Sequence, residues 1–92
     1  MEATELFGRY HRLIRQVASR RADREASRKE IVRVMEQFRK DCLQLSPFHG
    51  RFLRDELLAQ LEEEALHCAD ENMKAVFTIA LKHLEADNDV AR

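Results

Sequence analysis

Apolar residues recur at intervals of three and four along most of the chain, the spacing that places them on one face of an α-helix. Four such stripes can be traced. The first contains Leu6, Phe7, Tyr10, Leu13, Ile14 and Val17. The second contains Ile31, Met35, Phe38, Cys42 and Leu45. The third contains Phe48, Phe52, Leu53, Leu57, Leu58, Leu61, Ala65 and Cys68. The fourth contains Met73, Val76, Phe77, Ala80, Leu81 and Leu84. This pattern predicts an all-α protein.

Three breaks separate the stripes, near residues 19–27, 45–50 and 68–72. Ser27 to Glu30 reads as a capping box, which predicts that the second helix starts at Ser27. Ser46 is a preferred N-cap and Pro47 a preferred first helical residue, so a third helix should start there. Gly50 is expected to loosen that turn, and Asp70 is expected to cap the fourth helix.

Two architectures fit these segments. We expect residues 1–92 to form one domain, a compact bundle of three to four helices. The alternative is a long helical hairpin that folds at Pro47 and dimerises into a four-helix bundle. In both cases a homodimer is expected, because a chain this short buries only a small share of its surface.

Composition and charge agree with a helical bundle. The 92 residues include two glycines and one proline, with 45% hydrophobic and 36% charged residues, which excludes a disordered tail. The net charge of −1 conceals an asymmetry: residues 1–45 carry 11 Lys and Arg against 7 Asp and Glu, and residues 46–92 carry 5 against 10. We interpret this as two halves that pack with complementary rims.

The expected location is the cytoplasm. Cys42 and Cys68 are too few for a disulfide framework, which favours a reducing compartment. The longest apolar run, residues 75–81, is too short to cross a membrane. The alternative is the mitochondrial matrix, because residues 6–22 form an amphipathic segment with several arginines and no acidic residue.

No catalytic, cofactor or metal site is expected. Glu64 and His67 have the E-x-x-H spacing of di-iron bundles, but those sites need a second copy of the motif, and none precedes His11, His49 or His83. Neither cysteine lies in a recognisable catalytic pattern. The sequence therefore predicts a protein that is not an enzyme.

Four arginines form a basic face opposite the first stripe: Arg9, Arg12, Arg15 and Arg20. Such a face could neutralise phosphates of a nucleic acid. The near-neutral net charge and the lack of a glycine-turned helix-turn-helix pattern argue against that role. An anionic membrane surface is disfavoured as well. We interpret these arginines as a solvated helix face.

One family resemblance can be stated. The segment from Tyr10 to Arg15, followed by Phe38 with its basic neighbours, resembles the signature of the LYR-motif proteins. Arg9 stands where that signature has leucine, and His11 where it has arginine. The resemblance implies a small helical adaptor in mitochondrial assembly, with an acyl carrier protein as one partner. The motif positions would be Tyr10, Leu13, Ile14 and Arg15, with Phe38 as the downstream aromatic residue.

The leading functional expectation is a non-catalytic protein–protein interaction module, acting as a small regulator, antagonist or assembly adaptor through apolar helix faces. It rests on four apolar stripes in a chain with little length to cover them. Phe48, Phe52 and Phe77 are the predicted partner-binding residues. Phe48 and Phe52 are the preferred anchors, because they flank Gly50 where the chain is least constrained. The alternative is that both rings close the end of the bundle.

Overall fold

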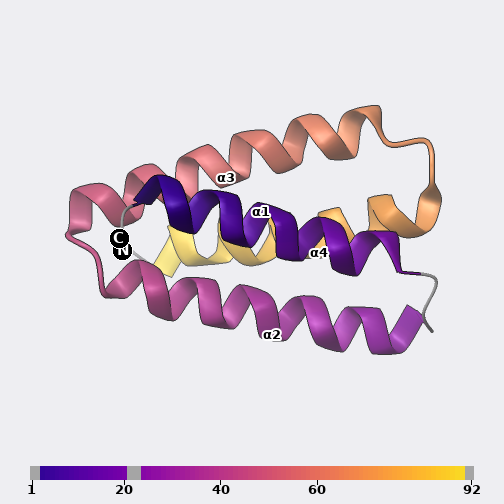
Figure 1. The fold of residues 1–92 in the computed structure, drawn as a ribbon, viewed down its shortest axis with the longest axis horizontal. Helices are drawn as coiled ribbons and strands as arrows, with labels where there is room; N and C mark the ends of the chain where they lie inside the picture. The colour runs from indigo at the N-terminus through magenta and orange to yellow at the C-terminus, as the bar shows by residue number, and fades with distance from the viewer. Residues whose placement is uncertain (1–2, 21–23, 91–92) are drawn as a thin grey trace.

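The computed structural model of the chain describes residues 3–20 and 24–90, apart from the side chains of Arg24 and of residues 87–90. Every regular element in these ranges is a helix: α1 is Ala3–Ser19, α2 is Arg24–Leu43, α3 is Pro47–His67 and α4 is Glu71–Val90. Successive helices run in opposite directions, so the start of α1, the α2–α3 turn and the end of α4 share one end of the bundle (Figure 1). The predicted all-α bundle is confirmed. The long hairpin is wrong, because the chain already reverses between α1 and α2.

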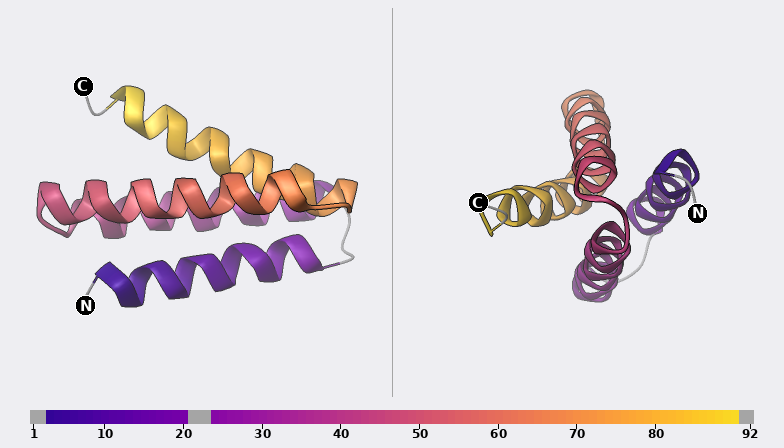
Figure 2. Two further views of the ribbon diagram at one scale, coloured as in Figure 1. Left: turned by 90° about the horizontal axis from the view of Figure 1, so that it is seen from above. Right: turned by 90° about the vertical axis from the view of Figure 1, so that its left-hand side faces the viewer.

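The apolar stripes of the four helices meet in a single core. Seen along the bundle, the helices occupy four corners, with α2 and α3 on opposite sides (Figure 2). Each helix supplies fully buried side chains, of which the largest are Tyr10, Phe38, Phe77, Ile14, Ile31, Leu53, Leu57, Leu61 and Leu84. The centres of the four predicted stripes are therefore confirmed as the core.

Side-chain caps start α3 and α4 where the sequence predicts them. The hydroxyl of Ser46 accepts a hydrogen bond from the amide of His49, with Pro47 in the first helical position. One carboxylate oxygen of Asp70 accepts hydrogen bonds from the amides of Asn72 at 2.8 Å and Met73 at 3.1 Å. These contacts satisfy amide groups that a helix start leaves without intrahelical partners.

The predicted start of α2 is wrong by three residues. The helix begins at Arg24, and Ser27 lies inside its first turn with its side chain buried. Glu30 does not close a capping box with Ser27. Its two carboxylate oxygens instead accept hydrogen bonds from the Arg20 guanidinium at 2.6 and 2.7 Å, which joins the end of α1 to α2. A contact between helices thus replaces the local motif.

Gly50 has a different role from the one predicted. It does not loosen a turn, because it lies within α3, is buried and has no positive φ. A Cβ atom added there would lie 2.9 Å from the carbonyl oxygen of Cys42, which belongs to the backbone of α2. Glycine therefore permits the close approach of α2 and α3 beside their connecting turn.

This contact gives a first prediction. Gly50→Ala is expected to lower the free energy of unfolding by about 1–3 kcal/mol, because the atom it meets is backbone and cannot move aside cheaply. Gly8→Ala is the matched control, since an added Cβ has nothing within 4 Å there. In that open helical position alanine should stabilise by about 0.5–1 kcal/mol. Urea denaturation followed by circular dichroism measures both, and equal effects would contradict the packing role of Gly50.

Candidate functional site

Large hydrophobic side chains are left exposed on α3. Phe48 is 74% exposed, Phe52 is 52% exposed and Leu66 is 77% exposed. Phe48 and Phe52 are separated by one helical turn. Leu66 follows Phe48 by 18 residues, which is five turns of 3.6 residues, so both point in the same direction about 27 Å apart. One further large hydrophobic residue, Leu43 at the end of α2, is also exposed.

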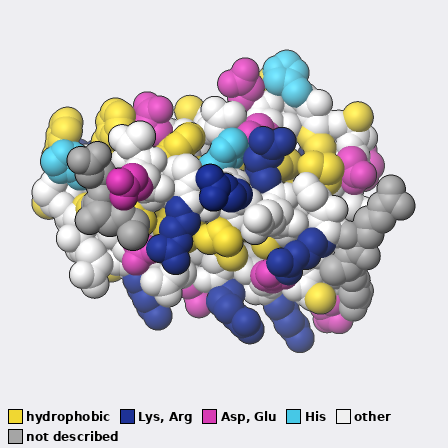
Figure 3. Space-filling view, viewed as in Figure 1, with side chains coloured by type: hydrophobic (Ala, Val, Ile, Leu, Met, Phe, Trp, Pro, Cys, Tyr) yellow, Lys and Arg dark blue, Asp and Glu magenta, His cyan; other side chains and the backbone are white. Residues whose placement is uncertain are grey.

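Phe48, Phe52 and Leu66 belong to a continuous surface that we call the outer face of α3. It consists of exposed residues at helical spacing: Phe48, Arg51, Phe52, Asp55, Glu56, Ala59, Glu62, Glu63 and Leu66. The buried residues of α3, among them Leu53, Leu57 and Leu61, lie on the opposite side. Along the upper edge of the molecule, over α3, hydrophobic side chains lie near the α2–α3 turn and acidic ones lie farther along (Figure 3). An ordinary surface helix has one apolar face, and α3 has apolar residues on two.

The structure separates the three predicted partner-binding residues. Phe48 and Phe52 lie together on the outer face, so they do not close the end of the bundle, nor do they belong to the buried part of the third stripe. Phe77 is 2% exposed and lies in the core, away from any partner. The cap at Ser46 fixes the start of α3 and thereby the direction of Phe48. The Phe48 ring also meets the His49 ring edge-on, with 5.5 Å between centroids.

Most of the carboxylates on the outer face form no ion pair with the described residues of the chain. Within residues 3–20 and 24–90, no ion pair joins Glu56, Glu62 or Glu63 to a basic side chain. Asp55 lies 3.6 Å from the guanidinium of Arg54. Glu64 does not belong to the outer face, because it is half-buried and contacts His11 on α1. The outer face therefore combines apolar ends with an acidic middle.

Three of the four arginines of the predicted basic face of α1 are accessible to an anionic ligand. Arg20 is paired with Glu30 on α2, while Arg9, Arg12 and Arg15 are exposed and form no ion pair with another described residue. A shallow hollow of about 870 Å³ follows α1 beside Arg12 and Arg15. Among the described residues, its lining comes from α1 and from Arg20, which directly follows that helix. This arrangement agrees with a solvated helix face.

Sequence reasoning missed two polar contacts that position α1. The Tyr10 hydroxyl donates a hydrogen bond to the carboxylate of Asp41 on α2, and a ring nitrogen of His11 contacts the carboxylate of Glu64 on α3. The only signal in the sequence was a tyrosine within an apolar stripe, because a buried hydroxyl needs a partner. These contacts fix α1 against both neighbouring helices.

Burial, the hydrogen bond to Asp41 and the charge of that carboxylate all raise the pKa of Tyr10 well above its ordinary value. Because the folded state favours the protonated phenol, its stabilising effect is complete below about pH 10, the pKa of an unfolded tyrosine, and is lost at higher pH. The chain has one tyrosine and no tryptophan, so ultraviolet absorbance reports this group alone.

We therefore predict that tyrosinate absorbance in the folded protein appears only well above pH 10, together with loss of helix. The urea-unfolded chain is the control and should titrate near pH 10. Asp41→Asn should lower the pKa of Tyr10 while leaving it above the ordinary value, since burial is the largest cause. Titration of the folded protein at the same pH as the unfolded chain would contradict the buried contact.

The E-x-x-H pair is not assembled into a site. Glu64 contacts His11 on α1 and accepts a hydrogen bond from the amide of Gln60 on its own helix, and His67 is exposed at the end of α3. Across the described ranges, no group of three or more His, Cys, Asp or Glu side chains could hold a metal ion. Cys42 lies in α2 and Cys68 directly follows α3, and the two form no disulfide.

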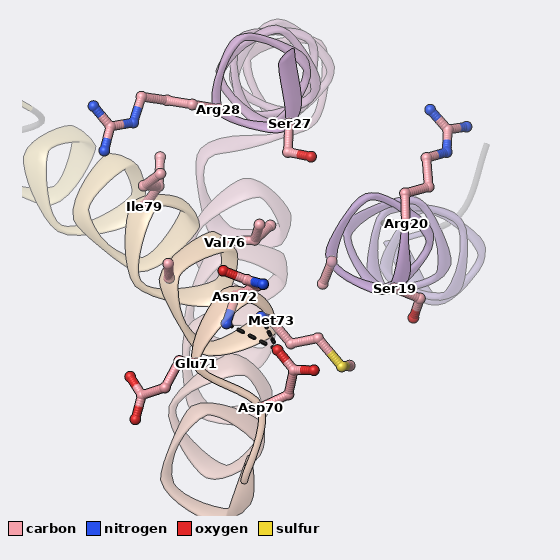
Figure 4. A pocket seen from close by; sticks show the side chains of 12 residues that line it. Ser19, Arg20, Ser27, Arg28, Asp70, Glu71, Asn72, Met73, Val76 and Ile79 are labelled. Atoms are coloured by element: carbon pink, nitrogen blue, oxygen red, sulfur yellow. Dashed lines mark hydrogen bonds between the residues drawn. The ribbon is translucent and has the colours of Figure 1, made fainter. Parts of the chain in front are cut away.

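A hollow of about 750 Å³ lies between the end of α1 and the starts of α2 and α4. Met73, Val76 and Ile79 line it, and Ser27 points into the space (Figure 4). Two of its charged residues already have partners, since Asp70 caps α4 and Arg20 pairs with Glu30. The other described residues of its lining offer no convergent set of polar groups that would orient a ligand.

Three of the five residues that carry the LYR resemblance lie in the core, whereas Leu13 is half-buried and Arg15 is exposed. Tyr10, Ile14 and Phe38 are fully buried, and the rings of Tyr10 and Phe38 meet edge-on with 5.1 Å between centroids. Such residues would recur in any amphipathic helix that faces this core.

In comparisons with known proteins, no protein-family model matches the sequence, and no curated protein or solved structure is significantly similar. The LYR resemblance therefore stays a prediction. A search of the described helices for a segment long and apolar enough to cross a membrane found none.

Proposed function

We propose that this chain is a non-catalytic protein–protein interaction domain that binds a partner through the outer face of α3. One observation carries the proposal: Phe48 and Phe52, one turn apart, expose 74% and 52% of their surface although the bundle has a complete core elsewhere. Exposed apolar surface next to polar residues is typical of interaction sites. Aromatic residues are also the ones that most often dominate binding energy at protein interfaces.

The site lies on a rigid element, which suits recognition. α3 is held by its N-terminal cap, by the close contact of Gly50 with α2, and by the buried residues of its inner face. A partner would therefore contact side chains that already have their bound positions, and this chain would lose little conformational entropy on binding. Roles as a regulator, an antagonist or an assembly adaptor are all compatible with such a surface.

The proposal is tested by comparing partner capture by two variants of the tagged protein in its native cells. Phe48→Ala with Phe52→Ala removes the aromatic rings, and we expect a partner found with the wild type to be lost, with the helical content unchanged. The control reverses the polar face of α1 with Arg9→Glu, Arg12→Glu and Arg15→Glu, and this variant should keep the partner.

The opposite result would contradict the proposal: the arginine variant would lose the partner and the phenylalanine variant would keep it. It would point instead to an anionic ligand on α1, whose binding should fall steeply as salt is raised. Binding through the phenylalanines should depend only weakly on salt.

A further inference from the structure

The outer face of α3 carries large apolar residues at the two ends of a line with heptad spacing, and acidic residues take the place of apolar ones in its middle. Its central line is formed by exposed residues at alternating intervals of four and three: Phe48, Phe52, Asp55, Ala59, Glu62 and Leu66. Heptad spacing is the pattern with which one helix receives another along its length. The length of this line, about 27 Å, corresponds to five helical turns. A second helix of about 20 residues would cover it.

The charged residues along this line indicate which charge the second helix should carry. Asp55, Glu56, Glu62 and Glu63 lie on or beside the line, and Arg51 is the one basic residue of the outer face. Glu56, Glu62 and Glu63 have no ion-pair partner in the described part of the chain. A partner with acidic residues opposite them would be repelled, and like charges that face each other across an interface cost several kcal/mol.

The same charges disfavour a second copy of this chain as the occupant. In a parallel pair of α3 helices each acidic residue would face its own copy. In an antiparallel pair centred on Leu57, Glu56 of one molecule would lie beside Glu56 of the other. Phe48 would then meet Leu66 and Arg51 would lie opposite Glu63, but Phe52 would meet the charged Glu62, and the two Glu56 carboxylates would repel each other.

We propose that the outer face of α3 binds a basic amphipathic helix of another polypeptide, with apolar residues at both of its ends and Lys or Arg in its middle. This inference rests on the proposed function and specifies its partner. Phe48, Phe52 and Leu66 supply the apolar contacts, which provide most of the affinity. Glu56, Glu62 and Glu63 select the basic partner over an acidic one.

The test uses three synthetic, fluorescein-labelled peptides of about 20 residues, with fluorescence anisotropy measured at physiological salt. The first has leucine at the seam positions of its two ends and lysine at and beside those of its middle, the second has glutamate in place of each lysine, and the third is a scrambled form of the first. We expect saturable binding of the lysine peptide, with the glutamate and scrambled peptides weaker by about ten-fold or more.

Two double variants change the net charge by the same amount at different places. They distinguish peptide binding at the outer face of α3 from general attraction to the charge of the protein. Glu62→Lys with Glu63→Lys should lower the affinity for the lysine peptide by about ten-fold and raise the affinity for the glutamate peptide. Glu36→Lys with Glu85→Lys alters exposed residues of α2 and α4 and should change neither affinity by more than about two-fold. Phe48→Ala with Phe52→Ala should weaken the lysine peptide by about ten-fold.

Equal binding of the lysine and glutamate peptides, equal effects of the two charge variants, or binding of no peptide would overturn the inference. A dimer of the unliganded protein that Phe48→Ala with Phe52→Ala dissociates would also overturn it, because a second copy would then be the occupant. If these peptides fail while the phenylalanine variant still loses its partner in cells, the interaction function stands and only the basic-helix partner is rejected.

Discussion

Phe38→Ala is expected to lower the free energy of unfolding by about 3–5 kcal/mol, the usual cost of removing a fully buried phenylalanine ring. The Phe38 side chain is 1% exposed and packs edge-on against Tyr10, so its removal leaves a cavity between α2 and α1. A domain of this size has only about 5–15 kcal/mol of stability in total. Urea denaturation followed by circular dichroism measures the change.

The matched surface substitution is Arg12→Ala. Arg12 is exposed on α1 and forms no ion pair with another described residue, so the expected change is within about 0.5 kcal/mol. If the two substitutions destabilised the protein equally, the assignment of buried and exposed faces on these helices would be wrong.

The second large effect distinguishes the phenylalanines that the sequence pattern grouped together. Phe77→Ala should cost about 3–5 kcal/mol, because that ring lies in the core on α4. Phe48→Ala should cost less than about 1 kcal/mol, since nearly three quarters of its surface is already in contact with water. Phe52→Ala, half exposed, should lie between the two. Thermal and urea denaturation of the three variants provide the comparison.

This order of stabilities also bears on the proposed function. A residue that binds a partner should be removable without unfolding its own domain. If Phe48→Ala unfolded the protein as readily as Phe77→Ala, the exposed position of Phe48 and its role as an anchor would both be contradicted.

Much of the fold could be predicted because apolar periodicity and capping residues act locally. The stripe around Phe38, the N-cap at Ser46 and the N-cap at Asp70 each follow from a few neighbouring residues. The start of α2 was misplaced because Glu30 pairs with Arg20, a contact that no local pattern contains. Gly50 was misread for the same reason, since its close neighbour is Cys42 on another helix.

The candidate site was only half visible in the sequence. Phe48 and Phe52 could be selected as aromatic residues beside a turn. Leu66 could be assigned to the site only once the structure placed it five turns after Phe48 on an exposed face. Periodicity alone could not show which face of α3 the other helices would cover, because this helix is apolar on two sides. Phe77 was included because a stripe does not reveal which of its members a partner can reach.

The homodimer expected from the sequence stays a prediction, because a chain this short buries only a small share of its surface. The functional expectation rested in addition on four apolar stripes that so short a chain has little length to cover. The bundle buries the centres of all four stripes within one molecule. In the described ranges, most of the large hydrophobic residues that remain exposed lie on the outer face of α3, and we propose that its acidic residues favour a different partner over a second copy.

The most direct test of the outer face as a binding surface is site-specific photo-crosslinking in native cells. A photoreactive phenylalanine analogue replaces Phe48, Phe52 or Leu66 in turn, and Glu36 on the exposed side of α2 serves as the control position. The predicted result is one common crosslinked partner from all three α3 positions and none from position 36. Crosslinks that are absent from α3, or that occur equally from position 36, would contradict a binding surface on this helix.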